Sequence, residues 1–326
     1  MANFLVTGTA GFIAFRVAEL LLEEGHTVYG VDNLNDAYDV RLKNYRLSRL
    51  KQKPKFHFRK LDISKRASID SIGEWIPDTV EAVINLAARA GVRTSLTDPW
   101  VYVDTNMVGT LNLLELCRRD GIKKFVLAST SSLYAEESEP PFKETDDTDH
   151  PLQPYAASKK GAEAMAYVYH YLYDIDVTVL RYFTVYGPAG RPDMVMFRFC
   201  QWIAEGKPVV INGDGEQSRG FTYLDDIARG TIQALKPVGY EIINLGGHEV
   251  ITINHLVGML EERIGQKAQI IHQEIHPADV HTNQADVTRA AEILGWKPKV
   301  NLEDGVTRLV DWYMQERSWA SQVETP

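Results

Sequence analysis

The sequence has little cysteine, no long run of apolar residues and no excess of basic residues. Its 2 cysteines, Cys117 and Cys200, are too few for a disulfide framework and show no metal-binding spacing, so we expect buried free thiols. Its 9 histidines form no H-E-x-x-H or comparable ligand set, and no metal site is predicted. Because no stretch approaches the roughly 18 apolar residues of a transmembrane helix, we expect no membrane span.

The charge balance is acidic, with 44 acidic residues against 35 basic ones and a net charge of -9. This balance argues against a nucleic-acid partner, since contact with a phosphate backbone needs a basic face. Local arginines and backbone amides could still hold a phosphorylated small molecule. The N-terminus leads directly into an apolar run, without the basic segment or cleavage site of a signal peptide. We therefore expect a cytoplasmic protein in a reducing environment.

Apolar runs and helical patterns alternate through the first half of the 326-residue chain. Short apolar runs predict strands, and apolar residues at helical spacing predict helices between them. This alternation predicts an α/β fold built on a doubly wound parallel sheet of the Rossmann type. The expected strands are residues 4–6, 27–31, 56–61, 82–86, 124–128 and 177–182, and the expected helices include residues 106–119 and 156–173.

A glycine-containing loop, residues 8–14, lies between the first expected strand and the first expected helix. Gly8 permits a tight turn, Gly11 lets the backbone approach a pyrophosphate, and the small Ala14 lets helix and strand pack closely. The N-terminus of the helix supplies free N–H groups for the phosphates. Asp32 ends the second strand, where a carboxylate accepts hydrogen bonds from ribose hydroxyls and repels a 2′-phosphate. The pattern predicts a dinucleotide site that favours NAD over NADP; a plain turn and a capping aspartate are the alternatives.

The composition of the chain changes after about residue 181, where Gly- and Pro-containing segments in residues 187–220 indicate loops and short elements. We expect residues 1–180 to form the NAD-binding Rossmann domain and residues 181–326 to form a smaller α/β lobe that binds the substrate. A helix is expected at 223–235 and a strand at 242–245, so part of residues 221–247 is expected to return to the first domain.

Tyr155 and Lys159 stand four residues apart in the segment PYAASKK. This spacing places both side chains on one helix face, and Pro154 is typical of a helix start. A free tyrosine has a pKa near ~10 and is a poor base at neutral pH. A nearby ammonium and a positively charged nicotinamide both favour the phenolate. The pair therefore predicts proton transfer beside the cofactor, whereas the later tyrosines of this helix are typical of core or interface packing.

Motifs along nearly the whole chain resemble those of the extended short-chain dehydrogenase/reductase family. They are TGTAGFIA at 7–14, LDI at 61–63, NLAARAG at 85–91, STSS at 129–132, YAASK at 155–159, RYFTVYGP at 181–188, GDGEQSRGFTYLDDI at 213–227 and HPADV at 276–280. The resemblance implies NAD-dependent remodelling of nucleotide-linked sugars. Within the nucleotide-sugar epimerase branch, AGVRTSLTDPWVYVDTN at 90–106 and YFTVYGPAGRPDM at 182–194 are most similar to UDP-glucuronate 4-epimerases.

The resemblance implies a mechanism in which Tyr155, with Lys159 and the Thr130 hydroxyl, takes the proton from the sugar's 4-hydroxyl. The nicotinamide takes hydride from C4, the 4-keto sugar turns over, and hydride returns to its other face. The resemblance also implies a set of contacts to NAD. These contacts come from Gly8, Gly11, Phe12, Ile13, Asp32, Asn33, Asp62, Ile63, Leu86, Ala87, Ala88, Asn106, Lys159 and Tyr182. Asn85, where histidine is commoner in the family, precedes a stretch that is expected to contact NAD chiefly through its backbone.

By family analogy, Ser131, Ser132 and Thr184 face the sugar. The family's 4,6-dehydratases carry an Asp-Glu pair at the first two positions, because elimination of water needs an acid and a base. Its UDP-glucuronate decarboxylases usually carry glutamate at the second position, and galactose-type epimerases usually carry asparagine in place of Thr184. Hydroxyls can donate hydrogen bonds to a substrate carboxylate without adding a like charge. We expect them to hold a 4-keto uronate away from the geometry in which it loses CO₂.

The remaining expected substrate contacts are cationic or bind the nucleoside. Arg219 matches the family's phosphate-binding arginine, and Arg191 and Arg93 are further candidates, since a guanidinium suits phosphate or carboxylate. A surface salt bridge is the alternative for each arginine. Asp279 matches the residue that contacts the uridine ribose, although the preceding His276 and its neighbours depart from the family's pattern.

Family members often dimerise through a four-helix bundle, and a homodimer is expected here. Leu111, Leu114, Met165, Val168 and Leu172 could supply its apolar faces, or they could face the sheet, since periodicity does not separate the two cases.

Other functions remain open from the sequence. A UDP-glucose or UDP-N-acetylglucosamine 4-epimerase is the first alternative, and a UDP-glucuronate decarboxylase is a weaker one. A catalytically inactive NAD-binding sensor predicts a broken Tyr155–Lys159 pair or a missing Thr130, and all three residues are present. An oxidoreductase that releases NADH predicts free NADH, whereas an epimerase predicts almost none.

Overall fold

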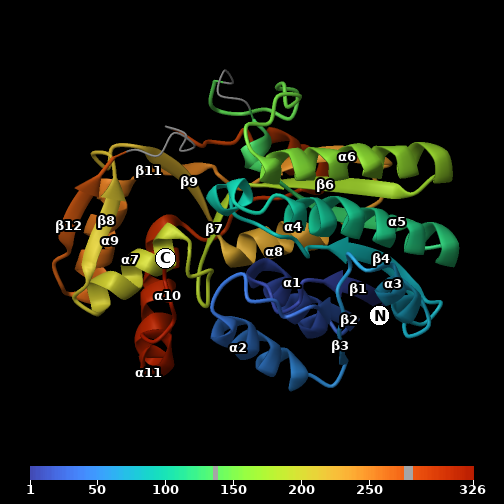
Figure 1. The fold of residues 1–326 in the computed structure, drawn as a ribbon, viewed down its shortest axis with the longest axis horizontal. Helices are drawn as coiled ribbons and strands as arrows, with labels where there is room; N and C mark the ends of the chain where they lie inside the picture. Colours follow the sequence, from blue (N-terminus) through green and yellow to red (C-terminus); the bar gives the residue numbers. More distant parts are fainter. Residues whose placement is uncertain (135–138, 275–281) are drawn as a thin grey trace.

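The computed structural model describes residues 1–134, 139–274 and 282–326. A seven-stranded parallel sheet runs through the structure (Figure 1). All six strands expected before residue 183 are present, and the predicted fold class is confirmed. The strands of this sheet are β1 (Asn3–Thr7), β2 (Thr27–Asp32), β3 (Phe56–Lys60), β4 (Val80–Asn85), β5 (Lys124–Thr130), β6 (Asp176–Tyr182) and β10 (Tyr240–Leu245).

The strand order is β10-β6-β5-β4-β1-β2-β3, and every pair of neighbours is parallel. The chain therefore begins in the middle of the sheet, builds β1 to β3 toward one edge and then β4 to β6 toward the other. The direction reverses between β1 and β4. In doubly wound folds, ligands bind in the crevice at the carboxyl ends of the strands at this point.

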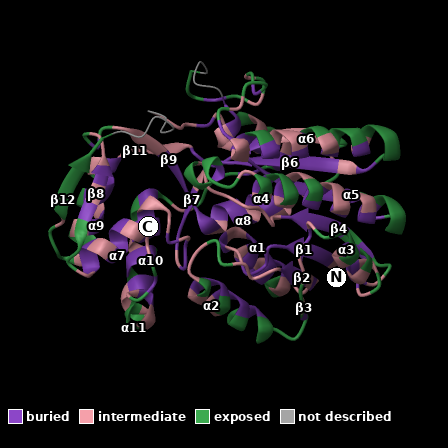
Figure 2. Ribbon diagram, in the orientation of Figure 1, coloured by how far each residue is buried: buried purple, intermediate pink, exposed green. Residues whose placement is uncertain are grey.

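Helices cover both faces of the sheet. Alternate residues of β1 serve two cores, because side chains of a strand point to opposite faces: Phe4 and Val6 join one core, and Leu5 joins the other. Figure 2 shows the buried sheet with exposed residues on the outer sides of the helices. One face carries α1 (Phe12–Glu23), α2 (Val40–Lys51) and α8 (Leu224–Gln233), and the other carries α3 (Arg66–Gly73), α5 (Gly109–Asp120) and α6 (Pro154–Tyr173).

The helical region expected at 106–119 is composite. A short α4 (Trp100–Tyr102) leads into a π-helix, η2 (Val103–Val108), and α5 follows. The sequence pattern located the helical region but not its wider turn, because a single π turn leaves the apolar pattern on either side intact. The helix expected at 223–235 begins at Leu224, since Tyr223 is the last residue of a strand.

The remaining elements form a second lobe around a core that includes Phe197, Leu256 and Tyr313. Its strands make a three-stranded sheet, β11-β9-β7, and a two-stranded sheet, β12-β8. The strands are β7 (Thr184–Tyr186), β8 (Pro208–Asn212), β9 (Ser218–Tyr223), β11 (Glu249–Thr252) and β12 (Gln269–Gln273), and the helices are α7 (Val195–Ala204), α9 (Ile253–Ile264), α10 (Leu302–Gln315) and α11 (Arg317–Ala320). Two 3₁₀ helices, η1 (Arg93–Leu96) and η3 (Ser131–Leu133), and a second π-helix, η4 (Ala290–Leu294), complete the elements.

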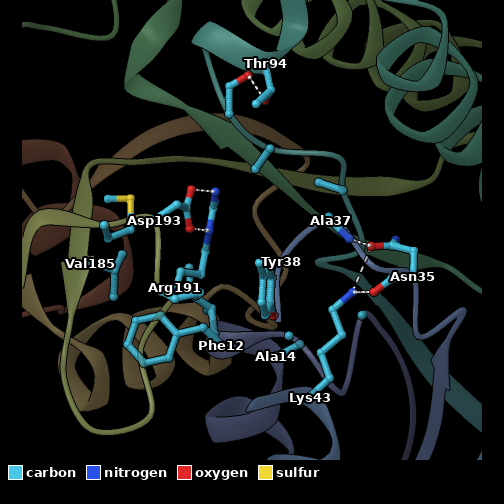
Figure 3. Close-up of a pocket in the computed structure, with 18 of the residues that line it drawn as sticks. Phe12, Ala14, Asn35, Ala37, Tyr38, Lys43, Thr94, Val185, Arg191 and Asp193 are labelled. Carbon is cyan, nitrogen blue, oxygen red and sulfur yellow. Dashed lines mark hydrogen bonds and ion pairs between the residues drawn. The ribbon is translucent and has the colours of Figure 1, made fainter. Parts of the chain in front are cut away.

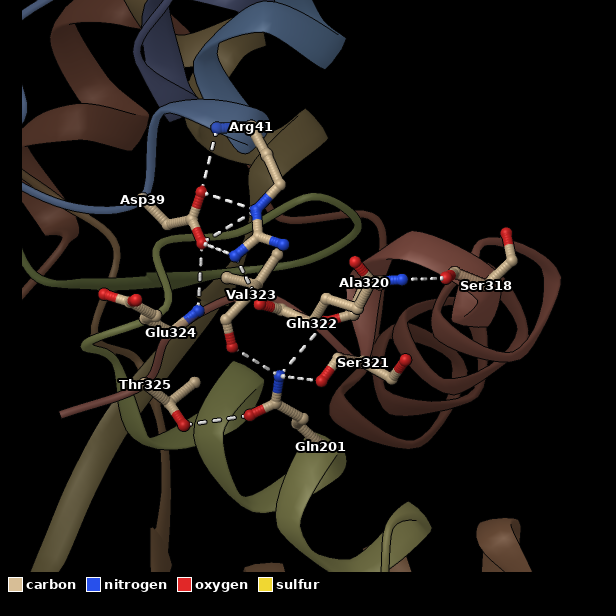
Figure 4. Close-up of polar contacts among 10 residues, drawn as sticks. All are labelled: Asp39, Arg41, Gln201, Ser318, Ala320, Ser321, Gln322, Val323, Glu324 and Thr325. Atoms are coloured by element: carbon tan, nitrogen blue, oxygen red, sulfur yellow. Dashed lines mark hydrogen bonds and ion pairs between the residues drawn. The ribbon is translucent and has the colours of Figure 1, made fainter.

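The C-terminal segment, residues 320–326, connects the second lobe to the first (Figure 4). On α7, the Gln201 Nε2 donates to the carbonyls of Ala320 and Val323 at 3.0 and 2.8 Å. On the other side, the Glu324 N–H donates to Asp39 Oδ2 at 3.0 Å. Asp39 is also the N-cap of α2, where its Oδ1 accepts the Arg41 N–H at 3.0 Å. The segment is therefore held by side chains from both halves of the molecule.

Cys117 and Cys200 are buried free thiols, as the sequence predicts. Burial raises the pKa of Cys200 to about 12, which disfavours the reactive thiolate. Among the described residues, no helix is long and apolar enough to cross a membrane. Within the same three ranges, His, Cys, Asp and Glu side chains form no cluster that could hold a metal ion.

Candidate active site

A cavity of about 1480 Å³ opens at the carboxyl ends of the parallel strands. Residues that follow β1, β2, β4 and β5 line it, among them Gly8, Asn33, Ala87 and Ser131. Residues from the second lobe and the C-terminal segment complete the lining. The cavity therefore lies at the crevice where the strand order reverses, between the two lobes.

The loop after β1 has the backbone geometry that a pyrophosphate needs. Gly8 has φ +75°, and a Cβ added to it would lie 2.9 Å from the backbone N and Cα of Ala87. A Cβ at Gly11 would lie 2.8 Å from the Gly8 carbonyl oxygen. Gly11 caps α1 without a side-chain hydrogen bond, and the first-turn residues Phe12, Ile13 and Ala14 line the cavity. These features fit a dinucleotide phosphate group.

Asp32 lies at the end of β2 and is held by two backbone groups. Its Oδ2 accepts the Ala10 N–H at 3.0 Å, and its Oδ1 accepts the Leu34 N–H at 2.7 Å. The carboxylate lines the cavity and is 8% exposed. A fixed carboxylate at this position fits the ribose of an adenine dinucleotide and opposes a 2′-phosphate.

Asn35, Tyr38 and Lys43, which the sequence analysis did not select, also line the cavity. Lys43 of α2 is 5% exposed, and its Nζ donates to the carbonyl and Oδ1 of Asn35 at 2.7 and 2.8 Å. Burial lowers the pKa of Lys43 to about 8, although the charge of Asp32 opposes this shift. Figure 3 shows Tyr38 between the Lys43–Asn35 contacts and Arg191. The only sequence signal for them is that they follow Asp32 closely.

The first turns of α6 bring the predicted proton-transfer residues to the cavity. Tyr155 and Lys159 both line it, and the Lys159 Nζ donates to the Ala128 carbonyl at 2.8 Å. Burial raises the pKa of Tyr155, whereas a hydrogen bond with Thr130 and the charge of Arg191 lower it. The ring of Tyr102 packs edge-on at 6.0 Å from that of Tyr155. The phenol is thus fixed between a hydroxyl, a cation and an aromatic ring.

Arg191 is the cation of the second lobe that lines the cavity near Tyr155. Its Nε donates to Asp193 Oδ1 at 3.0 Å and its Nη2 to Oδ2 at 2.5 Å (Figure 3). A fork of this kind is the geometry in which a guanidinium binds carboxylate or phosphate. The arginine is therefore paired within the protein at the place where an anionic ligand would meet it.

Most of the residues expected at the site line this one cavity. From the catalytic and substrate sets these are Thr130, Ser131, Ser132, Tyr155, Lys159, Thr184 and Arg191, and from the cofactor set they are Gly8, Gly11, Phe12, Ile13, Asp32, Asn33, Asp62, Ile63, Leu86, Ala87, Ala88, Lys159 and Tyr182.

Three expected site residues among those that the structure describes, Asn106, Arg219 and Arg93, do not line the cavity. Asn106 is buried behind it, where its Oδ1 accepts the Arg89 N–H at 2.9 Å and its Nδ2 donates to Ser158 Oγ at 2.9 Å. Arg219 lies on β9 and donates to the Ser218 carbonyl at 2.7 Å, and Arg93 begins η1. Asp279 lies outside the described residues. Asn106 therefore orders the loop after β4 from behind.

Comparison with known proteins gives relatives that cover nearly the whole chain. A family model described as GDP-mannose 4,6 dehydratase matches residues 5–309. The UDP-glucuronate 4-epimerase of Thermodesulfobacterium geofontis is 57% identical over 313 residues, which is 96% of this chain and 96% of that protein.

Two solved structures share the fold. The UDP-glucuronic acid 4-epimerase from Bacillus cereus, in complex with UDP-glucuronic acid and NAD, is 36% identical with a TM-score of 0.89, over 96% of this chain and 99% of that one. The UDP-glucose 4-epimerase from Thermotoga maritima, with UDP-glucose, is 33% identical with a TM-score of 0.89, over 97% and 99%.

Proposed function

Because this chain belongs to the GDP-mannose 4,6-dehydratase family of extended short-chain dehydrogenases/reductases, we propose that it is an NAD-dependent isomerase that converts UDP-glucuronate to UDP-galacturonate. The observation that carries this function is the lining of the cavity around Tyr155. Thr130, Ser131, Ser132 and Thr184 all line the cavity, and all four carry hydroxyls. The relative from T. geofontis, 57% identical and named for this activity, supports the same assignment.

The chain's own residues hold and move the proton. The Tyr155 phenolate takes the proton of the sugar's 4-hydroxyl, and Thr130 keeps the phenolic oxygen oriented by the hydrogen bond described above. Lys159 supplies a positive charge that favours the phenolate. When bound, NAD supplies the acceptor that takes hydride from C4 and later returns it to the opposite face. Tyr155 then returns its proton to the 4-oxygen, so the reaction has no net redox change.

NAD is held by the first lobe. The loop carrying Gly8 and Gly11, with the first turn of α1, receives the pyrophosphate, and Asp32 receives the adenosine ribose. Leu86 to Ala88, after β4, and Tyr182, at the end of β6, lie toward the nicotinamide end. Asn106 contributes by ordering the β4 loop from behind.

The hydroxyls of Ser131, Ser132 and Thr184 distinguish this reaction from those of related dehydratases and decarboxylases. Elimination of water needs a carboxyl pair at 131–132, and this chain has Ser131 and Ser132 instead. Neutral hydroxyls accept a uronate without charge repulsion, and Thr184 adds a further hydroxyl to the lining of the same cavity. Their grip on the carboxylate keeps the 4-keto uronate from losing CO₂. We assign the diphosphate to Arg219, with Arg191 and Arg93 as helpers, and the uridine ribose to Asp279; of these arginines, Arg191 lines the cavity, and the family resemblance alone supports Arg219 and Arg93.

The test is product analysis with purified protein and added NAD. With UDP-glucuronate we expect UDP-galacturonate, no UDP-pentose and almost no free NADH. UDP-glucose and UDP-N-acetylglucosamine are assayed in parallel at equal concentration. Faster epimerisation of either neutral sugar would overturn the assignment of the substrate, and a net yield of NADH would overturn the assignment as an isomerase.

A separate experiment tests whether the hydroxyls keep the 4-keto uronate from losing CO₂. Thr184→Val and Ser131→Ala each remove one hydroxyl from the sugar end of the cavity with little change of volume. We expect UDP-pentose to appear among the products of both variants. Thr307→Val, on the exposed side of α10, is the matched control and should give the wild-type product. Variants whose product stays free of UDP-pentose would show that these hydroxyls do not protect the intermediate.

We also assign a homodimer in the cytoplasm to this chain. The outer sides of α4, η2 and α6 carry exposed apolar side chains, including Trp100, Val168 and Leu172 at 76%, 43% and 58% exposure. Leu114 is buried against the sheet instead, so it is not available for that face. A second copy is the occupant that such a surface fits. Light scattering after size exclusion should give the dimer mass, and Val168→Glu/Leu172→Glu should give the monomer mass.

Residues 1–180 and 181–326 form the cofactor and substrate domains in this assignment, with part of 221–247 returning to the first. The position of β10 beside β6 in the large sheet supports that return, as does the packing of α8 against α1. β9 stays with the second lobe, where it pairs with β7 and β11.

A further inference from the structure

A buried ion pair lies directly behind the proton-transfer residues. Glu163 is one helical turn after Lys159 on α6, and Arg181 is near the end of β6; they are 3% and 2% exposed. The Arg181 Nε donates to Glu163 Oε1 at 3.1 Å, and its Nη2 donates to Oε2 at 2.9 Å. This is a bidentate pair, the strongest geometry available to these two groups.

Both partners also contact the segments that carry the site. The Ser129 Oγ donates to Glu163 Oε1, and Ser129 is followed by Thr130. The Arg181 Nη1 donates to the Tyr134 hydroxyl at 3.2 Å, and Tyr134 directly follows η3. The pair therefore joins α6, the end of β5, the end of β6 and the turn that carries the two serines. Of these residues Ser129 lines the cavity, whereas Glu163, Arg181 and Tyr134 lie behind its wall.

The pair also sets the charge around Lys159, which is 3% exposed. Burial lowers the pKa of Lys159 to about 8, and the charge of Glu163 raises it. Elements packed against α6 carry other titratable or charged groups, and Glu163 is the one that acts on Lys159 in this way. These other groups are Tyr155, Lys160, Tyr167, Tyr169, His170, Tyr171 and Tyr173 on α6 itself, Asp176, Arg181 and Tyr182 on β6, Lys124 on β5, Asp104 on η2, Tyr102 on α4, Arg93 on η1, and Glu115, Cys117, Arg118, Arg119 and Asp120 on α5.

We propose that Glu163 and Arg181 are positioning residues: Glu163 keeps the Lys159 ammonium charged behind Tyr155, and Arg181 holds the Glu163 carboxylate in place and offsets part of its charge. The proposal rests on the function assigned above, because it concerns the same proton transfer. Lys159, Glu163 and Arg181 together carry one net positive charge. Loss of the carboxylate alone leaves two cations facing each other, whereas loss of the guanidinium alone leaves a neutral Lys159–Glu163 pair. The two losses therefore act on Lys159 and Tyr155 with opposite sign.

The experiment compares the dependence of kcat on pH in two single variants. In Glu163→Gln both Lys159 and Tyr155 lose their protons more readily, so the acid and alkaline limbs move to lower pH by on the order of one unit. In Arg181→Gln the Glu163 carboxylate has lost its cationic partner, so its negative charge makes Lys159 and Tyr155 hold their protons more strongly. Both limbs of the kcat profile therefore move to higher pH. Glu163→Gln/Arg181→Gln restores one net positive charge and should return the limbs toward the wild-type positions.

Arg181→Lys and Asp176→Asn provide the controls. Arg181→Lys keeps the positive charge but cannot form the bidentate pair with Glu163. We therefore expect a lower kcat, with the acid and alkaline limbs of its pH profile at the wild-type positions. Asp176 forms an ion pair with Lys124. These two residues are neighbours at the start of β6 and β5, whereas Arg181 and Ser129 are neighbours near the other end of the same two strands. Asp176→Asn therefore breaks a partly buried ion pair of the same two strands without touching Lys159. It should lower thermal stability and leave both limbs unchanged.

A second measurement needs no sugar. Tyrosinate absorbance is titrated against pH with NAD bound, in each variant and in the same variant with Tyr155→Phe added. The difference between the two titrations reports the ionisation of the Tyr155 phenol directly. The shifts should have the same opposite signs as the limbs. If this titration shifts as expected while no UDP-sugar is epimerised, the positioning role stands and the proposed function fails.

A structural role alone gives a different result. Folded variants that lose activity with unmoved limbs and an unmoved phenol titration would overturn the proposal, as would shifts of the same sign in Glu163→Gln and Arg181→Gln. Thermal melts establish which variants fold. If Glu163→Gln does not fold, Arg181→Gln and the double variant decide, because only charge positioning predicts an upward shift that the second change reverses.

Discussion

The two halves of the cavity are built differently. In the cofactor half, residues such as Gly8 and Asp32 follow directly on strands of one sheet and are held by backbone hydrogen bonds. In the substrate half, Thr184, Arg191 and the C-terminal segment come from separate parts of the second lobe. There the polar groups are paired with each other, as Arg191 is with Asp193. On the proposed assignment, NAD meets groups already fixed by backbone hydrogen bonds, whereas an anionic substrate at Arg191 takes the place of its internal partner Asp193.

The largest expected effect is at Tyr155, where the two halves meet. Tyr155→Phe removes the acid/base group and should lower kcat by ~10²–10⁴-fold, the usual contribution of a general base. The affinity for NAD should stay at the wild-type value, because the phenol is not part of the phosphate loop. Turnover and calorimetric titration with NAD are the measurements. Turnover within about threefold of wild type would be inconsistent with proton transfer by Tyr155.

A rigid cofactor half should not tolerate a side chain at its closest contact. Gly8→Ala combines left-handed strain with a Cβ at 2.9 Å from the Ala87 backbone, and should cost about 1–3 kcal/mol of stability and weaken NAD binding. Gly25→Ala is the matched control: Gly25 has φ +85°, and nothing lies within 4 Å of its added Cβ. Equal NAD affinities in the two variants would show that the close packing of Gly8 against the Ala87 backbone is not needed for NAD binding.

The exchange of partners in the substrate half is tested at Arg191. Arg191→Ala should raise KM for UDP-glucuronate by about tenfold, the value of one hydrogen bond to a charged group. Asp193→Asn should lower KM by roughly twofold to fivefold, because it releases the guanidinium from its internal partner. Asp70→Asn, in a surface pair with Arg119, makes the same change of net charge far from the site and should leave KM unchanged. A higher KM in Asp193→Asn would mean that the pair positions Arg191 rather than competes for it.

The smallest effect is expected in the C-terminal segment. Thr325 donates to Gln201 Oε1 and accepts from the Trp202 Nε1, both at 2.9 Å. Thr325→Val should cost about 1 kcal/mol of stability, the net value of such hydrogen bonds, and make the segment more accessible to a protease. The NAD affinity of the first lobe should change less than in Gly8→Ala. A loss of NAD affinity as large as in Gly8→Ala would show that the two halves are not independent.

The sequence predicted the cofactor half better because its residues are tied to local patterns. Gly8, Gly11 and Asp32 have fixed positions relative to strand ends, and Tyr155 and Lys159 share one helix turn. The Glu163–Arg181 pair was missed although a carboxylate four residues after Lys159 on a helix was a usable signal. Its partner lies on another element, and no spacing rule connects them.

The rest of the substrate half depends on contacts that spacing does not encode. Asp193 could be read as another loop acid, and the contact of Asp39 with Glu324 joins residues 285 positions apart. The helical period gave the region 106–119 but not the π-helix inside it. It also could not tell that Leu114 faces the sheet while Leu172 faces outward. These outcomes depend on tertiary packing rather than on local pattern.

Asp39 couples the first turn of α2 to the C-terminal segment. Its Oδ1 caps the N-terminus of α2, and its Oδ2 accepts the backbone N–H of Glu324. Fraying of the first helical turn and detachment of the last residues are therefore a single opening event with a single free energy. In hydrogen exchange, the amide protons of Arg41 and Glu324 should show the same protection factor and lose it together in Asp39→Ala.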